Sequence, residues 1–191
     1  MAKLGDSVVA AVMQQAPEQA SMGIPPMWNS YVTVDDVDAT AAKVEGAGGS
    51  VMVPPMDAMD AGRMAVVVDP AGAVICMWQA NQHMGAQLVN EHGTLCWNEL
   101  TTPDPGQVAP FYAELFGWAA LDEDMGDGNT YTMFNLGEEG VGGAMPPMME
   151  GIPPHWGVYF AVDDCDACVA QATELGGSVV VPPMDIQPGR F

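Results

Sequence analysis

One stretch of the chain occurs twice, and this internal repeat limits the folds that the chain can adopt. Residues 23–57 read GIPPMWNSYVTVDDVDATAAKVEGAGGSVMVPPMD, and residues 151–185 read GIPPHWGVYFAVDDCDACVAQATELGGSVVVPPMD. About three in five of the aligned positions are identical, which indicates a duplication. We therefore expect a protein built from repeated units.

Each copy predicts the elements of one βαβββ unit. An aromatic strand is expected at 28–34 and again at 156–162. Asp36 and Asp164 can each cap the helix that follows, because a side-chain carboxylate accepts hydrogen bonds from free N–H groups. In the first copy three further strands are expected at 50–53, 63–68 and 73–79, the first of them broken by Pro54-Pro55.

The middle of the chain predicts a divergent unit of the same plan. A strand at 94–102 precedes a helix with Asp104 as its cap and Gly117 at its end. Pro110 lies inside this helix, where proline costs about 3 kcal/mol, so we expect a kink or a delayed helix start. The apolar stripe of the helix is Val108, Phe111, Tyr112 and Leu115. The strands that complete the unit are expected at 118–125, 131–136 and 140–145.

The repeat also predicts a two-domain organisation. Leu4-Gly5 and the residues after it match Leu136-Gly137 and the residues after it, so the chain starts partway into one unit. The last unit stops at Arg190-Phe191, earlier than the corresponding unit of the first copy. We expect a first domain at 1–81 (N-terminally incomplete), a linker at 82–92 and a second domain at 93–191 (C-terminally incomplete). Such a chain is either a fragment or one that completes its sheets by association, as a homodimer or other self-associated form.

Composition excludes some partners. The chain has 25 acidic residues against four Lys and Arg, giving a formal net charge of -21, so nucleic acid is not expected to bind. It has no run of about 20 apolar residues and no signal peptide, so we expect a cytoplasmic protein without a membrane partner. Its four cysteines lack the spacing of a disulfide framework, and we expect them to be reduced.

Two sequence runs resemble a known family. The runs TLCWNELTTPDPGQVAPFYAELFGW and DPAGAVICMWQ are similar to the opening and closing segments of modules in the glyoxalase/bleomycin resistance protein/dioxygenase (vicinal oxygen chelate) superfamily, in particular its tandem two-domain glyoxalase-like type. The resemblance implies an α+β fold in which repeated βαβββ modules form cup-shaped mixed sheets, the glyoxalase/bleomycin resistance/dihydroxybiphenyl dioxygenase fold.

Enzymes of that superfamily hold a divalent metal with His, Glu or Gln on the first and last strands of each module. The matching positions here are Trp97, Gly157, Cys76 and about Asn29, none of which continues that ligand pattern. The three histidines, His83, His92 and His155, fall in loops or just before a strand. We therefore expect no metal cofactor; a divalent metal would be implied only if this alignment of ligands is wrong.

Glu99 is the one carboxylate inside an expected first strand, and Trp97 and Thr101 share its face. If that face lines the cup, Glu99 is the candidate catalytic residue, and Trp97 and Glu99 are candidate ligand-binding residues. The alternative is a strand glutamate that bonds to its neighbours or faces solvent.

Repeated positions supply the other candidates. Arg63 and Arg190 follow PPMD in the two copies; they predict either ion pairs with Asp57 and Asp185 or a clamp for an anion or carbonyl group at each cup. Four aromatic residues also recur in register and can form the wall of a binding site or pack in the core: Trp28, Tyr31, Trp156 and Tyr159.

Three functions remain open at this point. The missing ligands favour a metal-free protein that binds a small, aromatic or antibiotic-like molecule between modules. The alternative is an enzyme, a metal-dependent lyase or dioxygenase of the glyoxalase type with ligands elsewhere. The third is an incomplete protein without activity of its own, whose sheet edges pair with another chain.

Overall fold

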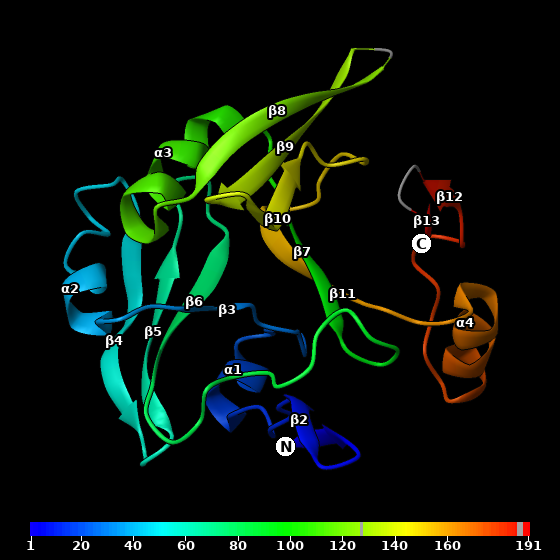
Figure 1. The fold of residues 1–191 in the computed structure, drawn as a ribbon, viewed down its shortest axis with the longest axis horizontal. Coiled ribbons are helices and arrows are strands. Elements are labelled where there is room, and N and C mark those ends of the chain that lie inside the picture. The colour runs from blue at the N-terminus through cyan, green and yellow to red at the C-terminus, as the bar shows by residue number, and fades with distance from the viewer. Residues whose placement is uncertain (127, 187–188) are drawn as a thin grey trace.

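Two mixed sheets, each with a helix beside it, make up most of the fold (Figure 1). The structure is a computed structural model, and it describes residues 1–126, 128–186 and 189–191. Within these ranges no helix is both long and apolar enough to cross a membrane. The fold is of the α+β class with curved mixed sheets, as the sequence predicted.

The four-stranded sheet has the order β3-β6-β5-β4. Its strands are β3 (Tyr31–Thr33), β4 (Ser50–Ala58), β5 (Gly62–Val68) and β6 (Val74–Ala80). β3 runs parallel to β6, and the other neighbours are antiparallel. Helix α2 (Val37–Ala41) follows β3, and the Asp36 carboxylate caps it by accepting from the Ala39 N–H. This is one βαβββ module.

Strand β4 differs from the expectation that Pro54-Pro55 would end it. It continues to Ala58, with register irregularities between Val51 and Val53 and between Val53 and Met56. β4 lies at the edge of the sheet, and an edge strand tolerates proline because the lost N–H has no partner strand to bond.

The five-stranded sheet has the order β11-β7-β10-β9-β8. Its strands are β7 (Leu95–Thr101), β8 (Ala119–Gly126), β9 (Asn129–Leu136), β10 (Glu139–Met145) and β11 (His155–Phe160). β7, α3 and β8 to β10 repeat the βαβββ order. β11, the first strand of the second copy, pairs antiparallel with β7.

Helix α3 (Pro105–Phe116) has the predicted ends, with Asp104 as its cap and Gly117 in the left-handed conformation at φ 71°. Its buried residues are the predicted apolar stripe. The helix begins at Pro105 and contains Pro110, so the delayed start is wrong. Pro110 has no N–H, so the one hydrogen bond lost is that to the Gly106 carbonyl. Gly106 lies in the first turn of the helix, which the Asp104 cap stabilises.

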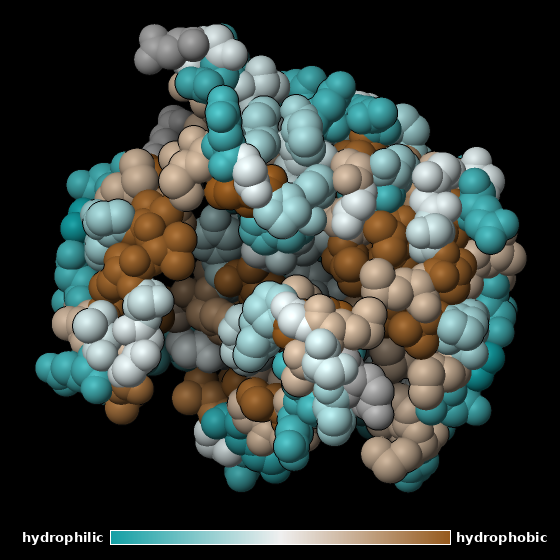
Figure 2. All heavy atoms as spheres, turned by 180° about the vertical axis from the view of Figure 1, so that it is seen from behind, coloured by the Kyte–Doolittle hydropathy of each residue, from teal (hydrophilic) through white to brown (hydrophobic). Residues whose placement is uncertain are grey.

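The remaining elements lie outside these two sheets. At the N-terminus, β1 (Ala2–Leu4) and β2 (Ser7–Ala10) form a hairpin, and α1 (Pro17–Ser21) follows. Helix α4 (Cys165–Glu174) has Asp164 as its predicted cap but has no buried residue. Near the C-terminal end, β12 (Asp185–Ile186) pairs antiparallel with β13 (Gly189–Arg190). In Figure 2 the surface is hollowed beside the α4 end of the molecule.

One core joins the two sheets. It contains Val37 and Val44, on or just after α2, and the whole buried stripe of α3. At its centre the Tyr112 hydroxyl donates to Asp69 Oδ2 at 2.8 Å and accepts from Trp156 Nε1 at 3.0 Å. Asp69 Oδ1 also accepts from the N–H groups of its own turn, residues 71–73. A hydrogen-bonded chain of three side chains therefore ties β11 and α3 to the four-stranded sheet.

Candidate functional site

The two faces of β7 have different surroundings. Leu100 is fully buried on the face that packs on α3. Trp97, Glu99 and Thr101 alternate with it and lie on the opposite face, where they are only partly buried. We call this second side the open face of the five-stranded sheet, and it carries the candidate Glu99.

Glu99 is held by two tyrosines from neighbouring parts of the sheet. The Tyr131 hydroxyl, from β9, donates to Glu99 Oε2 at 2.9 Å. The Tyr159 hydroxyl, from β11, donates to Oε1 at 2.9 Å. Tyr131 also accepts a hydrogen bond from Trp97 Nε1 at 2.8 Å. These four residues, Trp97, Glu99, Tyr131 and Tyr159, form what we call the aromatic–carboxylate cluster.

Two glycines flank the cluster, and one of them makes room for it. Gly143 of β10 and Gly157 of β11 are the cross-strand partners of Glu99 on its two sides. A Cβ atom at Gly143 would overlap the Tyr131 hydroxyl, so only glycine lets this tyrosine reach across β10 to Glu99. A Cβ atom at Gly157 would lie at ordinary contact distance, 3.6 Å from the Glu99 carbonyl oxygen.

The surroundings keep both tyrosines neutral. Burial raises the pKa of Tyr131, and the Glu99 charge adds to the effect. Burial and then the Glu99 charge also raise the pKa of Tyr159. Each hydroxyl therefore keeps its proton and remains a hydrogen-bond donor to the carboxylate at neutral pH.

The four repeated aromatic residues do not all lie at one site, although Tyr31 and Trp156 line a common pocket. Tyr159 joins the aromatic–carboxylate cluster, whereas Tyr31 lies on β3 with Cys76 as its cross-strand partner. Trp156 is 7% exposed and packs in the core, whereas Trp28 is 49% exposed and contacts Phe160 at a ring distance of 5.0 Å. Burial raises the pKa of the Cys76 thiol to about 11, so it stays protonated.

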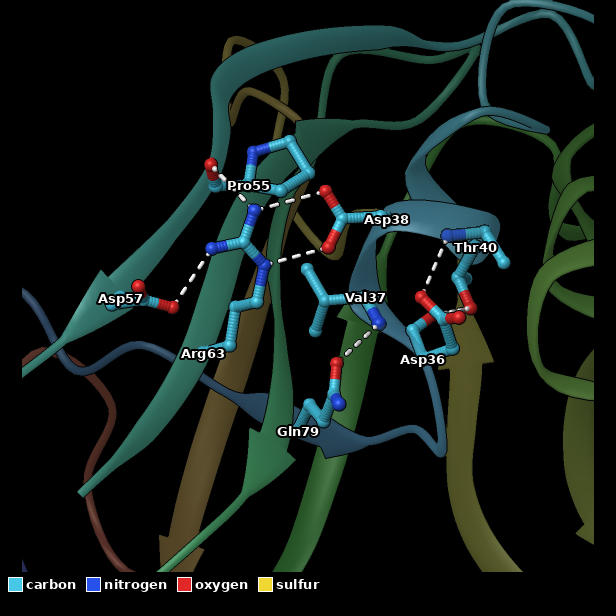
Figure 3. A network of polar contacts seen from close by, with 9 residues as sticks. Asp36, Val37, Asp38, Thr40, Pro55, Asp57, Arg63 and Gln79 are labelled. Carbon is cyan, nitrogen blue, oxygen red and sulfur yellow. Dashed lines mark hydrogen bonds and ion pairs between the residues drawn. The ribbon is translucent and has the colours of Figure 1, made fainter. Parts of the chain in front are cut away.

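Arg63 and Arg190 form the predicted ion pairs, and each has a second partner. Arg63 bonds to Asp57 at 2.8 Å and to both carboxylate oxygens of Asp38 (Figure 3). Arg190 bonds in the same way to Asp185 and Asp166. Each guanidinium lowers the pKa of its helix aspartate. The repeated VDDxDA segments carry the signal for Asp38 and Asp166, which the sequence analysis missed.

Sequence reasoning also missed Tyr131 and Gly143. Tyr131 is far from Glu99 in sequence, and only the strand order β7-β10-β9 brings the two side chains together. The available signal was the glycine-rich strand 140–143, since glycine within a strand often marks a close approach by another group.

The side chains around Glu99 do not form a metal site of that kind. Among the described residues, no three His, Cys, Asp or Glu side chains come together. Glu99 is surrounded by aromatic residues and glycines instead, and its two oxygens are bonded to tyrosine hydroxyls.

The modules, the sheets and the open face define an α+β protein of repeated βαβββ modules. The profile of the Glyoxalase/Bleomycin resistance protein/Dioxygenase superfamily matches residues 2–77 and 92–190. The chain belongs to this superfamily, which confirms the resemblance in its sequence.

Two relatives agree with this assignment. The chain is 48% identical over 192 residues to the "Putative glyoxylase CFP32" of Mycobacterium tuberculosis, covering 100% of this chain and 73% of that protein. It is 41% identical over 175 residues to the "Anthracycline biosynthesis protein DnrV" of Streptomyces peucetius, covering 91% of this chain and 63% of that protein.

Two solved structures share the fold at low sequence identity. A Mn(II)-bound glyoxalase from Novosphingobium aromaticivorans aligns with a TM-score of 0.54 and 18% identity, covering 81% of this chain and 54% of that one. A 2,2',3-trihydroxybiphenyl 1,2-dioxygenase from Sphingomonas wittichii aligns with a TM-score of 0.54 and 16% identity, covering 82% of this chain and 61% of that one. The chain thus spans little more than half of these proteins.

Proposed function

We propose that the chain binds a small, flat organic molecule on the open face of the five-stranded sheet, without the superfamily's catalytic metal. The aromatic–carboxylate cluster carries this proposal. It offers rings for stacking and a carboxylate fixed by two hydroxyls, on a face that the core does not use. Binding sites of this kind combine apolar walls with a few oriented polar groups.

The proposal gives each residue of the cluster a task. Trp97 and Tyr159 supply ring surface, Glu99 accepts hydrogen bonds from the ligand, and Tyr131 orients Glu99 and Trp97. Ligand binding by Trp28, Tyr31, Arg63, Trp156 and Arg190 stays a prediction. For both arginines, ion pairs with two aspartates already occupy the guanidinium.

Titration with N-phenyl-1-naphthylamine, a neutral flat molecule whose fluorescence rises in apolar sites, tests the proposal. The native chain should bind it saturably. Trp97→Leu should weaken binding by roughly tenfold, the size expected for an aromatic anchor. Trp28→Leu, at an exposed tryptophan outside the cluster, is the comparison variant and should weaken binding much less than Trp97→Leu. Equal affinity in both variants would contradict the site.

Native mass spectrometry tests the absence of the metal and the expected self-association. The chain is mixed with Mn²⁺, Fe²⁺ or Zn²⁺ and exchanged into volatile buffer. We expect no stoichiometric metal and a dimeric or larger species. One tightly bound divalent ion per chain would instead favour the metal-dependent lyase or dioxygenase. A strictly monomeric chain would contradict the self-association.

A further inference from the structure

Glu99 has no cationic partner within the part of the chain that is described. The chain has only four Lys and Arg residues. Arg63 and Arg190 each pair with two aspartates, and Lys43 pairs with Glu114 at 3.9 Å. Lys3 is exposed on β1, in the separate N-terminal hairpin. The carboxylate on the open face is therefore partly buried without a balancing charge.

The hydrogen bonds to Glu99 leave it able to accept more. A carboxylate has about four lone-pair positions, and the two tyrosine hydroxyls occupy two of them. Both donors are neutral groups, so they orient the carboxylate without cancelling its charge. A ligand that brings an N–H donor or a positive charge would complete the site.

The residues around Glu99 also suit a cation. Three aromatic side chains lie around Glu99. The hydroxyls of Tyr131 and Tyr159 donate to its carboxylate, and Trp97 is linked to it through the Tyr131 hydroxyl. The face of an aromatic ring attracts an organic cation, and tryptophan does so most strongly. A bare metal ion would need more ligands than one carboxylate, and no group of such ligands exists among the described residues.

We propose that the aromatic–carboxylate cluster selects organic cations, small molecules in which an ammonium group is joined to an apolar or aromatic body. The ammonium group lies against Glu99 and the body lies on the Trp97 ring. This inference rests on the proposed function, because it names the class of ligand that the same face takes. An anionic molecule of the same shape is excluded by the unpaired carboxylate.

Displacement of N-phenyl-1-naphthylamine tests the selectivity. The competitors are benzyltrimethylammonium and neopentylbenzene, its neutral analogue with carbon in place of nitrogen. On the native chain the cation should compete at roughly tenfold lower concentration than the neutral analogue, in line with a partly desolvated cation–π and charge interaction. Phenylacetate, an anion, should not compete.

Two charge-neutralising variants separate a specific site from the general attraction of a chain with net charge -21. Glu99→Gln keeps the shape of the side chain and should bring the two competitors within about twofold of each other. Glu45→Gln removes one charge from an exposed residue that follows α2 and should leave the native ratio unchanged. Circular dichroism confirms that each variant is folded.

The outcomes separate this inference from the proposed function. Equal competition by cation and neutral analogue on the native chain would overturn the cation selectivity even if Glu99→Gln failed to fold. An equal loss of preference in both variants would also overturn it. In either case the proposed function would stand if Trp97→Leu still weakened probe binding. No binding of any probe would overturn the proposed function itself.

Discussion

At the scale of single residues, the space beside Glu99 depends on one glycine. Gly143→Ala places a methyl group where the Tyr131 hydroxyl lies, so the hydroxyl must leave Glu99 or the strand must shift. We expect a loss of about 1–3 kcal/mol in unfolding free energy, the usual cost of overpacking, together with weaker probe binding. Urea denaturation and N-phenyl-1-naphthylamine titration measure the two effects.

Gly157→Ala is the matched control, because it adds the same methyl group on the other side of Glu99 at ordinary contact distance. It should change both measurements by much less. Similar losses in the two variants would show that Tyr131 does not need the space above Gly143.

The residues of the site were only partly predictable. The period-2 alternation of strand 94–102 placed Trp97 and Glu99 on one face, and the structure agrees. The Glu99 side chain does bond to its neighbours, as the alternative interpretation had it. Tyr131 was missed because a contact across the intervening strand β10 depends on sheet order, which no local pattern contains.

At the scale of elements, the Asp-capped helices α3 and α4 should respond differently to the loss of the cap. α3 buries four residues in the core, whereas α4 buries none. Asp104→Ala should lower the unfolding free energy by about 1 kcal/mol, because the cap of a helix coupled to the core is lost. Thermal and urea denaturation followed by tryptophan fluorescence measure this change.

Asp164→Ala should leave that transition almost unchanged and reduce only the helical signal in circular dichroism, since α4 can unwind without exposing the core. If the fluorescence transition shifted equally in both variants, α4 would have to be coupled to the core after all.

The positions of the helices could be predicted from local sequence signals, but the length of β4 could not. The caps, the stripe of α3 and the stop at Gly117 are local signals, and all are confirmed. The course of β4 through Pro54-Pro55 was missed because proline is tolerated only where the strand has a free edge. Edge position is a property of the assembled sheet.

At the scale of the whole molecule, all four tyrosines of the chain resist ionisation. Burial is the largest cause at each, raising the pKa of Tyr31 to about 12 and that of Tyr112, Tyr131 and Tyr159 above the usual value of 10.0. A pKa raised by folding means that stability is fully present below pH 10 and is lost as pH rises, because only the unfolded chain then releases its protons.

We therefore expect tyrosinate absorbance at 295 nm to appear above pH 10, in the same transition that abolishes the near-ultraviolet circular dichroism. Tyrosinate that forms around pH 10 while the dichroism stays native would contradict the burial of these hydroxyls. Folding also raises the pKa of the Cys76 thiol, from 9.0 to about 11. Its contribution to stability is lost in the same way as the pH rises, but the loss begins at a lower pH than for the tyrosines.

The hydrogen-bonded chain from Trp156 through Tyr112 to Asp69 also bears on how this repeated protein can evolve. Its three members come from three different modules. Loss of any one would leave a buried polar group without its partner, at a cost of about 1–3 kcal/mol. Trp28, the duplicate of Trp156, escapes this constraint because it lies half exposed. The two tryptophans occupy equivalent positions of the repeat. Substitution of Trp28 should cost little, whereas substitution of Trp156 also disturbs Tyr112 and Asp69.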